Sequence, residues 1–402
     1  MNNNTPEIRF KGFTDAWEQR RLGEVSEFSK GSGYSKSDLI DKGTPVILYG
    51  RLYTKYETVI EDVDTFVDMK EKSVISRGGE VIVPSSGETA EDIARASVVE
   101  KSGVILGGDL NIIKTDSVIS PTFLAITISN GNQQKELSKR AQGKSVVHIG
   151  NSDLKEVVLQ IPAFPEQTSI GTFFRTLDDA ITLHKRKLDG LKELKRGYLQ
   201  QMFPQAGESV PRVRFAGFTK PWEIKKAGEI FVSVSDKNCP HLPVLSASQE
   251  KGMVFRSELG IDIKYDINSL NTYKRIRQGQ FAIHLRSFQG GFAHSDLEGI
   301  TSPAYTILDY KNSNEHDSNY WKETFVSQLF IKRLETITYG IRDGRSISFS
   351  EFSTLEFSYP SKPEQATIGN FFCKFDNIIN SQQSKLDKLK QLKSAYLQKM
   401  FI

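Results

Sequence analysis

The sequence predicts an α+β fold in which two mixed α/β domains are joined by two long antiparallel coiled-coil helices with internal pseudo-two-fold symmetry. Three observations predict this fold. Two segments each occur twice along the chain, one of these segments has the apolar spacing of a coiled coil, and the stretches between the repeats contain short β-rich runs separated by glycine and polar turns. A chain of 402 residues has room for two or three domains.

The first repeated segment opens each half of the chain. Pro6–Val25 and Pro211–Ile230 are identical at half of their aligned positions, and both contain the run Arg-Phe-x-Gly-Phe-Thr followed by a tryptophan. Because the aromatic side chains are the same in both copies, we expect them to have the same structural role in both. We therefore expect them to pack the opening segment against the rest of its module.

The stretches that follow the opening segments, 26–160 and 231–358, show no convincing register with one another. Runs such as Glu80–Pro84, Val104–Leu106 and Phe281–Leu285 predict strands. A repeated frame with diverged inserts suggests one scaffold that carries two different specificities, although loops drifting around a fixed core would give a similar pattern. The resulting division of the chain is a first domain over 1–160, a central helix over 161–205, a second domain over 206–358 and a C-terminal helix over 359–402.

The second repeated segment predicts the two helices. Ile161–Phe203 and Tyr359–Phe401 agree at about half of their positions, and their apolar residues are spaced alternately three and four apart over four heptads. The expected helix-pairing residues are Phe174, Leu177, Ile181, Leu188, Leu191, Tyr198, Met202, Phe372, Phe375, Ile379, Leu386, Leu389, Tyr396 and Met400. Each copy has Pro-Glu where the first helical turn is expected, at Pro165 and Pro363. Antiparallel pairing would let both stripes bury each other with the same contacts made twice, along about 43 Å of helix.

Polar residues interrupt both apolar stripes at matching places. His184 corresponds to Gln382, and Lys195 corresponds to Lys393. Such residues set the register of a helix pair or, alternatively, form a docking face for partner helices.

Composition narrows the class of protein. The chain is 38% hydrophobic and 25% charged, and 53 Lys and Arg against 49 Asp and Glu give a net charge of +4. These values exclude a histone-like polycation but allow a basic face. The two cysteines, Cys239 and Cys373, cannot build a disulfide framework, no apolar run is long enough to span a bilayer, and the first residues do not resemble a signal peptide. We expect a cytoplasmic, soluble protein.

Enzyme signatures are incomplete. Gly143-Lys144-Ser145 looks like the end of a phosphate-binding loop, but Ser138 stands where the first glycine would be required. The six histidines are scattered without metal-ligand spacing, and no glycine-rich turn matches a nucleotide fingerprint. The sequence therefore predicts no catalytic residue and no metal site in this chain.

The two repeats together resemble a known family. The doubled P-x-x-P-E-Q-x-x-I-G-x-F-F run, the helix ending Y-L-Q-x-M-F and the R-F-x-G-F-T-x-x-W-E openings are similar to the specificity (S) subunit of type I restriction–modification systems. Weaker similarities lie between them, at Gly78–Gly87, Gly107–Ile113, Gly279–Gly291 and Ile300–Leu308. The resemblance covers essentially the whole chain.

This resemblance implies a function and a set of partners. Each of two target-recognition domains would read one half of a bipartite, asymmetric DNA sequence, and the helices would set the spacer between the halves. The chain would hold two adenine methyltransferase (M) subunits, and restriction/translocase (R) subunits would join the complex. No cofactor is expected in this chain, whereas S-adenosylmethionine, ATP and Mg would serve the partner subunits.

Residues that contact DNA are expected in glycine-flanked loops that carry cations, amides and hydroxyls, because these groups bind phosphates and base edges. Arg286 and Gln289 combine a guanidinium and an amide on a turn directly after a predicted strand, and Ser85 and Ser86 occupy the comparable turn of the first domain. The full candidate set is Lys30, Tyr34, Arg51, Tyr53, Lys55, Ser85, Ser86, Lys144, His148, Ser246, Ser248, Gln249, Lys251, Arg286, Ser287, Gln289, Arg342 and Arg345.

Two other functions stay open at this point. The chain could be a protein-binding adaptor with two globular domains on a helical spacer, which would bind a protein partner independently of salt. It could also be a fused restriction or methylation enzyme, which would turn over substrate on its own.

Overall fold

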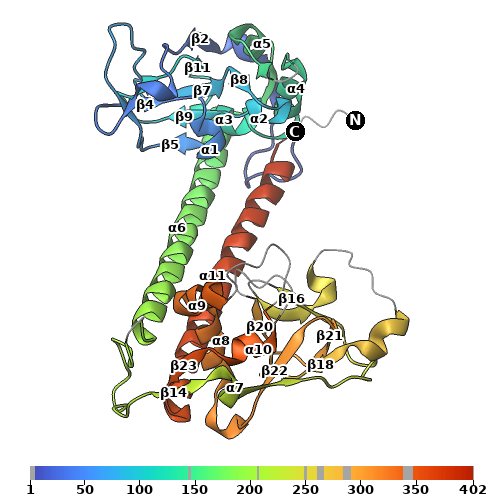
Figure 1. Ribbon diagram of the computed structural model, residues 1–402. Helices are drawn as coiled ribbons and strands as arrows, with labels where there is room; N and C mark the ends of the chain where they lie inside the picture. The colour runs from blue at the N-terminus through green and yellow to red at the C-terminus, as the bar shows by residue number, and fades with distance from the viewer. Residues whose placement is uncertain are drawn as a thin grey trace. The chain divides into compact units, whose positions relative to one another are not determined.

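A computed structural model describes residues 5–143, 146–205, 208–248, 251–259, 267–283, 291–337 and 347–401 (Figure 1). The chain divides into two compact units. Unit 1 consists of Met1–Lys185 and Ser384–Ile402, and unit 2 consists of Arg186–Gln383. Each unit therefore contains one domain, the first half of the long helix that follows that domain, and the last part of the other long helix.

Unit 1 is built on a five-stranded sheet in the order β2-β11-β7-β9-β5, in which only β5 and β9 pair in parallel. Its central strand β7 is buried over most of its length, which explains its almost continuous apolar sequence. The strands are β2 (Ser26–Lys30), β5 (Val59–Ile60), β7 (Glu80–Pro84), β9 (Ser97–Val99) and β11 (Leu110–Thr115). The strand predicted at Glu80–Pro84 is confirmed.

Smaller sheets and short helices complete unit 1. A four-stranded sheet has the order β10-β4-β6-β3, and two further strand pairs are β1-β13 and β8-β12. The strands are β1 (Glu18–Arg21), β3 (Leu39–Ile40), β4 (Thr44–Ile47), β6 (Phe66–Val67), β8 (Ser86–Gly87), β10 (Ile105–Leu106), β12 (Val147–His148) and β13 (Val158–Ile161). The helices are α1 (Arg51–Thr54), α2 (Ala90–Ile93), α3 (Pro121–Ile128), α4 (Gly131–Arg140) and α5 (Asn151–Lys155).

Unit 2 has a four-stranded antiparallel sheet in the order β15-β22-β19-β20 and three strand pairs, β14-β23, β16-β17 and β18-β21, among its described residues. Its strands are β14 (Glu223–Lys226), β15 (Phe231–Val234), β16 (Leu245–Ser248), β17 (Gly252–Phe255), β18 (Lys274–Ile276), β19 (Phe281–Ile283), β20 (Phe292–His294), β21 (Gly299–Thr301), β22 (Thr306–Tyr310) and β23 (Glu356–Tyr359). Its short helices are α7 (Ala227–Ile230), α8 (Ser318–Val326), α9 (Gln328–Ile337) and α10 (Phe349–Ser353). An aromatic core dominated by Trp321, Phe325 and Phe352 packs between the sheet and these helices.

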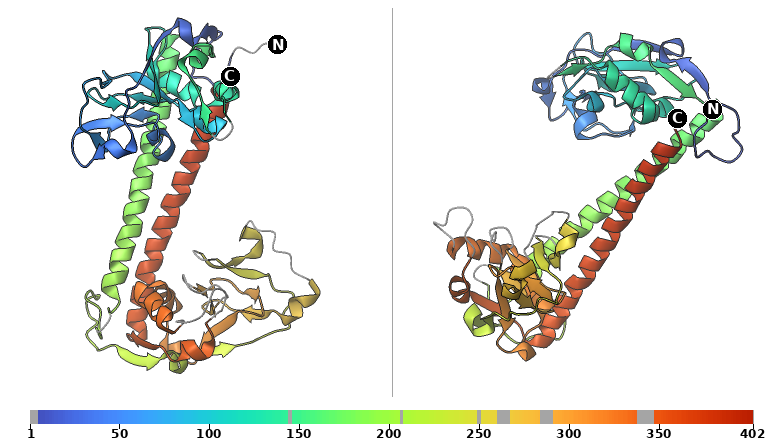
Figure 2. Two further views of the ribbon diagram at one scale, coloured as in Figure 1. Left: turned by 45° about the horizontal axis from the view of Figure 1, so that its top comes forward. Right: turned by 90° about the vertical axis from the view of Figure 1, so that its right-hand side faces the viewer.

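Two long helices are present where the heptads predict them. α6 spans Phe164–Met202 and α11 spans Lys362–Lys399, and each is continuous in both views of Figure 2 (α6 green, α11 red). In unit 1, Phe173 of α6 contacts Tyr396 of α11 with ring centroids 5.0 Å apart, whereas the later Asp178 meets the earlier Lys393. The two helices are therefore antiparallel.

The same helix contacts occur again in unit 2. Tyr198 contacts Phe371 with centroids 5.2 Å apart, and the Lys195 Nζ lies 2.7 Å from an Asp376 carboxylate oxygen. These two contacts repeat those of Tyr396 and Lys393 in unit 1, as the repeated sequences predict.

The apolar stripe points inward along both helices. All fourteen predicted helix-pairing residues are buried or half-buried. Large apolar residues outside the stripe are exposed instead, as at Leu183, Leu194, Ile378 and Leu392. The spacing of three and four thus identified the buried face correctly.

The lysines that interrupt the stripe set the pairing. Lys195 and Lys393 each form an ion pair with an aspartate of the opposite helix, at Asp376 and Asp178. A polar pair within the helix interface fixes the register, because any other alignment separates each lysine from the aspartate of the opposite helix. Of the two interpretations of the Lys195 and Lys393 positions, the structure favours this one.

The opening segment is fastened to the start of each long helix. Arg9 donates two hydrogen bonds to Glu166, at 2.8 and 2.7 Å, and Arg214 donates two to Glu364, at 2.9 and 2.7 Å. Both glutamates are buried. The sequence had indicated only that these glutamates lie in the first turn of each helix. The structure shows that each one forms a bidentate ion pair with an arginine that is distant in the sequence.

The glutamine and glycine residues of the P-E-Q-x-x-I-G run also have structural roles. Gln167 accepts a hydrogen bond from the Ser120 backbone N–H at the start of α3, and Gln365 accepts one from the Asp317 N–H at the start of α8. Gly369 lets α8 approach α11 closely, since a Cβ there would lie 2.8 Å from the Tyr320 nitrogen. The repeated run therefore joins each domain to its own helix.

Trp17 of the opening segment packs edge-on against Phe123 and Phe401, which confirms that this repeated tryptophan is interior.

A buried histidine predicts acid sensitivity of unit 2. His316 stacks on Tyr310 at 5.3 Å, and burial, opposed by Glu315 and reinforced by Lys225 and Lys362, lowers its pKa to about 4 from 6.5. Below pH 6.5 the unfolded chain takes up a proton that the folded chain refuses, so stability falls between pH 6.5 and 4 and then levels off. We expect a loss of about 1–3 kcal/mol after allowing for solvent screening.

Urea unfolding of the full chain, measured at steps of pH, checks this expectation. The variant His316→Gln should show a flatter profile over the same window, because glutamine does not titrate. A slope equal to that of the unaltered chain would assign the acid sensitivity to another group.

Candidate nucleic-acid interface

Three candidate DNA-contacting residues of the first domain come together on one surface. Strands β8 and β12 pair, which places the Ser86 Oγ 3.1 Å from the His148 Nδ1. The Tyr53 hydroxyl donates to the Ser86 carbonyl at 2.8 Å. His148 is exposed, while Ser86 and Tyr53 are half-buried. This group, which we call the β8–β12 cluster (Tyr53, Ser86 and His148), offers two hydroxyls and an imidazole to a ligand.

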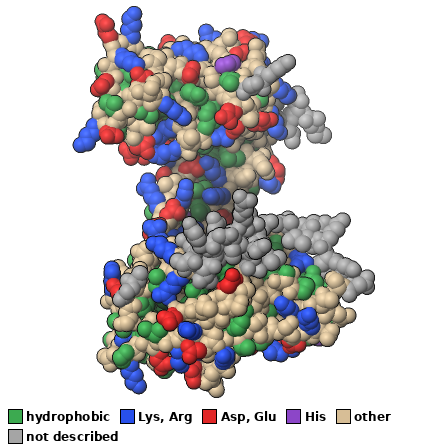
Figure 3. Space-filling model, viewed as in Figure 1, with side chains coloured by type: hydrophobic (Ala, Val, Ile, Leu, Met, Phe, Trp, Pro, Cys, Tyr) green, Lys and Arg blue, Asp and Glu red, His purple; other side chains and the backbone are tan. Residues whose placement is uncertain are grey.

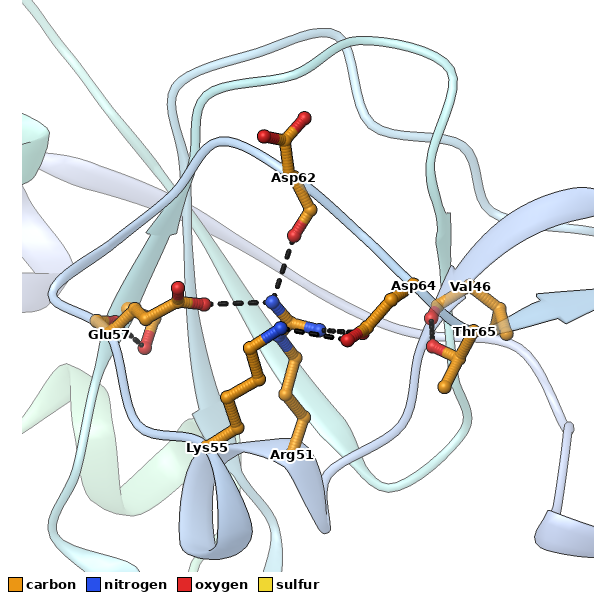
Figure 4. A network of polar contacts seen from close by, with 8 residues as sticks. Val46, Arg51, Lys55, Glu57, Asp62, Asp64 and Thr65 are labelled. Atoms are coloured by element: carbon orange, nitrogen blue, oxygen red, sulfur yellow. Dashed lines mark hydrogen bonds and ion pairs between the residues drawn. The ribbon is translucent and has the colours of Figure 1, made fainter. Parts of the chain in front are cut away.

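Arg51 and Lys55 belong to a different arrangement (Figure 4). The Arg51 guanidinium donates to Asp64, to Glu57 and to the Asp62 carbonyl, and its side chain is only 8% exposed. Lys55 pairs with the same Asp64. These bonds hold the loop after α1, so the burial of Arg51 favours a structural role, whereas the half-exposed Lys55 can still reach a phosphate.

The other first-domain candidates differ in accessibility. Lys30 is exposed at the end of β2, where burial of part of its chain, opposed by Asp109, lowers its pKa. Tyr34 is buried, and its hydroxyl accepts from the Lys70 backbone N–H at 2.7 Å. Ser85 is buried beside the β8–β12 cluster. Lys144 lies outside the described residues.

In the second domain, the described candidates share one hairpin. β16 pairs with β17, which places Ser246 and Ser248 on one strand and Lys251 in the turn. Lys251 is exposed, while Ser246 is buried and accepts a hydrogen bond from the Arg256 Nε at 2.9 Å. The candidates that lie outside the described residues are Gln249, Arg286, Ser287, Gln289, Arg342 and Arg345.

Arg256, which directly follows β17, is a residue beside the hairpin that the sequence did not single out. Its guanidinium lies over the Tyr273 ring, 5.9 Å from the centroid, and it joins β17 to the hairpin partner strand through Ser246. The available signal was a basic residue directly after the short apolar run Met253–Phe255.

The surface carries mixed charge. Figure 3 shows Lys and Arg interspersed with Asp and Glu over the face of the molecule in view. Among the described residues, no helix is long and apolar enough to cross a membrane. In that same part of the chain no group of three or more His, Cys, Asp or Glu side chains is placed to hold a metal ion.

Comparison with known proteins shows which family the chain resembles. Residues 14–193 match the family model of the type I restriction modification DNA specificity domain. The type I restriction enzyme MjaIX specificity subunit of Methanocaldococcus jannaschii is 24% identical over 310 residues, which cover 73% of this chain and 71% of that protein. The first half of the chain thus matches the specificity-domain model, and most of the chain is similar to a type I specificity subunit.

Two further comparisons extend this assignment along the chain. The putative type I restriction enzyme MjaX specificity subunit of the same organism is 20% identical, and the match covers 95% of this chain and 92% of that protein. The crystal structure of the type I restriction–modification S subunit from M. genitalium superposes with a TM-score of 0.66 at 14% identity, over 99% of each chain. The fold is therefore shared over the whole length.

Proposed function

We propose that this specificity subunit recognises a bipartite DNA target and serves as the non-catalytic scaffold of a type I restriction–modification complex. The observation that carries the proposal is the contrast within the chain. The frame is duplicated down to the pairs Lys195–Asp376 and Lys393–Asp178, and both domains share one four-strand order, β2-β11-β7-β9 and β15-β22-β19-β20. The strands added to this common sheet differ, because the first domain adds β5, the sheet β10-β4-β6-β3 and the pair β8-β12, whereas the second adds β16-β17 and β18-β21. A repeated frame with unlike domains suits the reading of two unlike half-sites.

In this proposal each domain reads one half of the target, through the β8–β12 cluster and Lys55 in the first domain and the β16–β17 hairpin in the second. Hydroxyl, imidazole and cationic groups on strand ends are suited to base edges and phosphates. The antiparallel helices hold the two readers at a set separation, which becomes the spacer of the target.

The partners are two adenine methyltransferase (M) subunits and restriction/translocase (R) subunits, with S-adenosylmethionine, ATP and Mg bound by those partners. The exposed Leu194 and Leu392, which are 49% and 43% accessible, support docking on the helices. They occupy equivalent positions in the two repeats and lie outside the stripe that pairs the helices. An exposed leucine repeated at one position on each helix suits two copies of the same partner.

Mapping of methylated adenines in the native genome tests the proposal. We expect a two-part target, and exchange of residues 26–160 for the corresponding segment of another family member should change one half and leave the other half and the spacer unaltered. As a control, exchange of 231–358 should change only the other half. Methylation that keeps both original halves after either exchange would contradict the assignment of one half-site to each domain.

The docking surface can be tested separately. The paired change Leu194→Glu and Leu392→Glu should weaken assembly with the methyltransferase subunit by about tenfold or more, because it places charge in an apolar contact. The matched change of the exposed and equivalent Lys187 and Lys385 to alanine should alter assembly much less. Analytical ultracentrifugation of the mixed subunits gives the affinity, and equal loss in both double variants would contradict docking through the leucines.

A further inference from the structure

Unit 1 contains a basic recess where α3 and α4 meet the two long helices. Two adjoining cavities of about 320 and 590 Å³ share Asn130, Gln134, Lys393 and Leu397 in their walls. Lys135 and Lys390 line the larger one together with Lys393, and Asp178 is the acidic residue there. We call this pair of cavities the lysine recess.

Unit 2 places a carboxylate at the equivalent position. Tyr320 of α8 packs on Trp222 and Phe203 as Phe123 of α3 packs on Trp17 and Phe401, so the two short helices correspond residue by residue. The hydrogen bonds of Thr324 to the Tyr320 carbonyl and of Thr127 to the Phe123 carbonyl fix the same alignment. Glu323 of unit 2 therefore corresponds to Ile126 of unit 1.

This single difference changes the charge balance around the repeated lysine. In unit 2, Lys195 lies 2.9 Å from Glu323 and 2.7 Å from Asp376, and the Glu323 side chain is only 3% exposed. These carboxylates raise the pKa of Lys195 against the effect of its burial. In unit 1, Lys393 has the partner Asp178, and the recess lined by Ile126 lies beside it.

The other cations of the lysine recess add to this imbalance. Among the described residues, Lys135 and Lys390 have no ion-pair partner, and both are exposed. α4 begins at the same recess, and the Asn130 side chain donates to the Ile126 carbonyl instead of capping the first turn. The recess is therefore positively charged and has apolar wall residues in Phe174 and Leu397.

We propose that the lysine recess binds the carboxylate side chains of an acidic segment of a partner protein, which supplies in unit 1 the charge that Glu323 supplies within unit 2. A recess with cations around apolar walls suits a flexible acidic side chain, whereas the phosphates of a duplex lie on a convex surface. This inference goes beyond the proposed function, because it does not depend on DNA recognition.

Binding of a fluorescein-labelled hexaglutamate peptide to the full chain, followed by fluorescence anisotropy, tests the proposal. The variant Ile126→Glu copies unit 2 and should weaken binding by about tenfold or more, because its own carboxylate occupies the site. The variant Ile126→Gln, which has nearly the same size without the charge, should bind within about threefold of the unaltered chain.

A second variant keeps the test decisive if Ile126→Glu does not fold. The double change Lys135→Ala and Lys390→Ala affects only exposed side chains and should weaken binding of the hexaglutamate peptide by about tenfold. The matched removal of two exposed lysines of unit 2, Lys332→Ala and Lys374→Ala, should change the affinity little.

Three results would overturn the proposal. The first is equal loss of binding in the two double-lysine variants, which would indicate unspecific attraction. The second is displacement of the peptide by inorganic phosphate at a similar concentration, which would indicate a general anion site. The third is that Lys135→Ala and Lys390→Ala weaken binding of a DNA duplex but not of the peptide, which would make the recess a phosphate contact.

Discussion

Replacement of Glu364 by alanine should destabilise unit 2 by about 3–5 kcal/mol, because it leaves the Arg214 guanidinium without its charged partner in a largely buried place. The two hydrogen bonds between these side chains, at 2.9 and 2.7 Å, hold the opening segment against α11, and they raise the pKa of Arg214. Trp222 of the same segment also donates to Glu364, at 3.4 Å. Loss of the carboxylate should therefore release the whole opening segment.

Equilibrium unfolding of the full chain in urea, followed by tryptophan fluorescence, measures this effect, since Trp222 and Trp321 report on unit 2. The matched control is Glu223→Ala, which removes a carboxylate from an exposed pair with Lys225. That control should cost less than about 1 kcal/mol. Equal effects of the two changes would show that the Arg214–Glu364 pair does not anchor the opening segment.

Removal of one heptad from each long helix should shorten the spacer of the DNA target by about three base pairs. Deletion of residues 182–188 and 380–386 removes about 10 Å of helix from each, at 1.5 Å per residue, and a base pair rises about 3.4 Å. The deletions keep the spacing of three and four, so both stripes stay apolar. Both half-sites should be unchanged, because neither domain is altered.

Deletion from one helix alone provides the control. The same number of residues separates Asp178 from Lys195 on α6 as separates Asp376 from Lys393 on α11, so the two ion pairs can form together only while the helices match in length. The one-sided variant should lose stable helix pairing and methylation. The methylation map decides the outcome, and a double variant with an unaltered spacer would show that the helices do not measure it.

Part of the fold could be predicted because it depends on local periodicity. The heptads of α6 and α11 identified the helices and their buried face, since side chains three and four apart necessarily share one helix face. Whether Lys195 and Lys393 set the register or form a docking face stayed open until the structure showed their ion pairs. The strand at Glu80–Pro84 was likewise apparent from its apolar run. The repeated tryptophans were expected to be interior because residues that are identical in both copies are expected to have the same structural role in both.

The candidate site was less accessible to the same reasoning. Residue type and a glycine-flanked loop suggested Arg51 and Tyr34, yet in the structure both side chains are hydrogen-bonded to other residues of the same domain. Only pairing of β8 with β12 brings Ser86 to His148, sixty-two residues further along the chain. Nothing in the local sequence records which carboxylates will surround a given arginine.

The sequence by itself therefore determined the duplicated frame, the antiparallel pairing of the helices and the resemblance to type I specificity subunits. The tertiary structure alone decided that Glu166 and Glu364 bind Arg9 and Arg214 and that Glu323 occupies the place of Ile126 in the other unit. It also decided that Lys135 and Lys390 have no ion-pair partner among the residues that the structure describes. The physical reason is the sequence separation over which each kind of interaction acts. Helical periodicity acts over three or four residues, whereas ion pairs and cavities depend on side chains that folding brings together from distant parts of the chain.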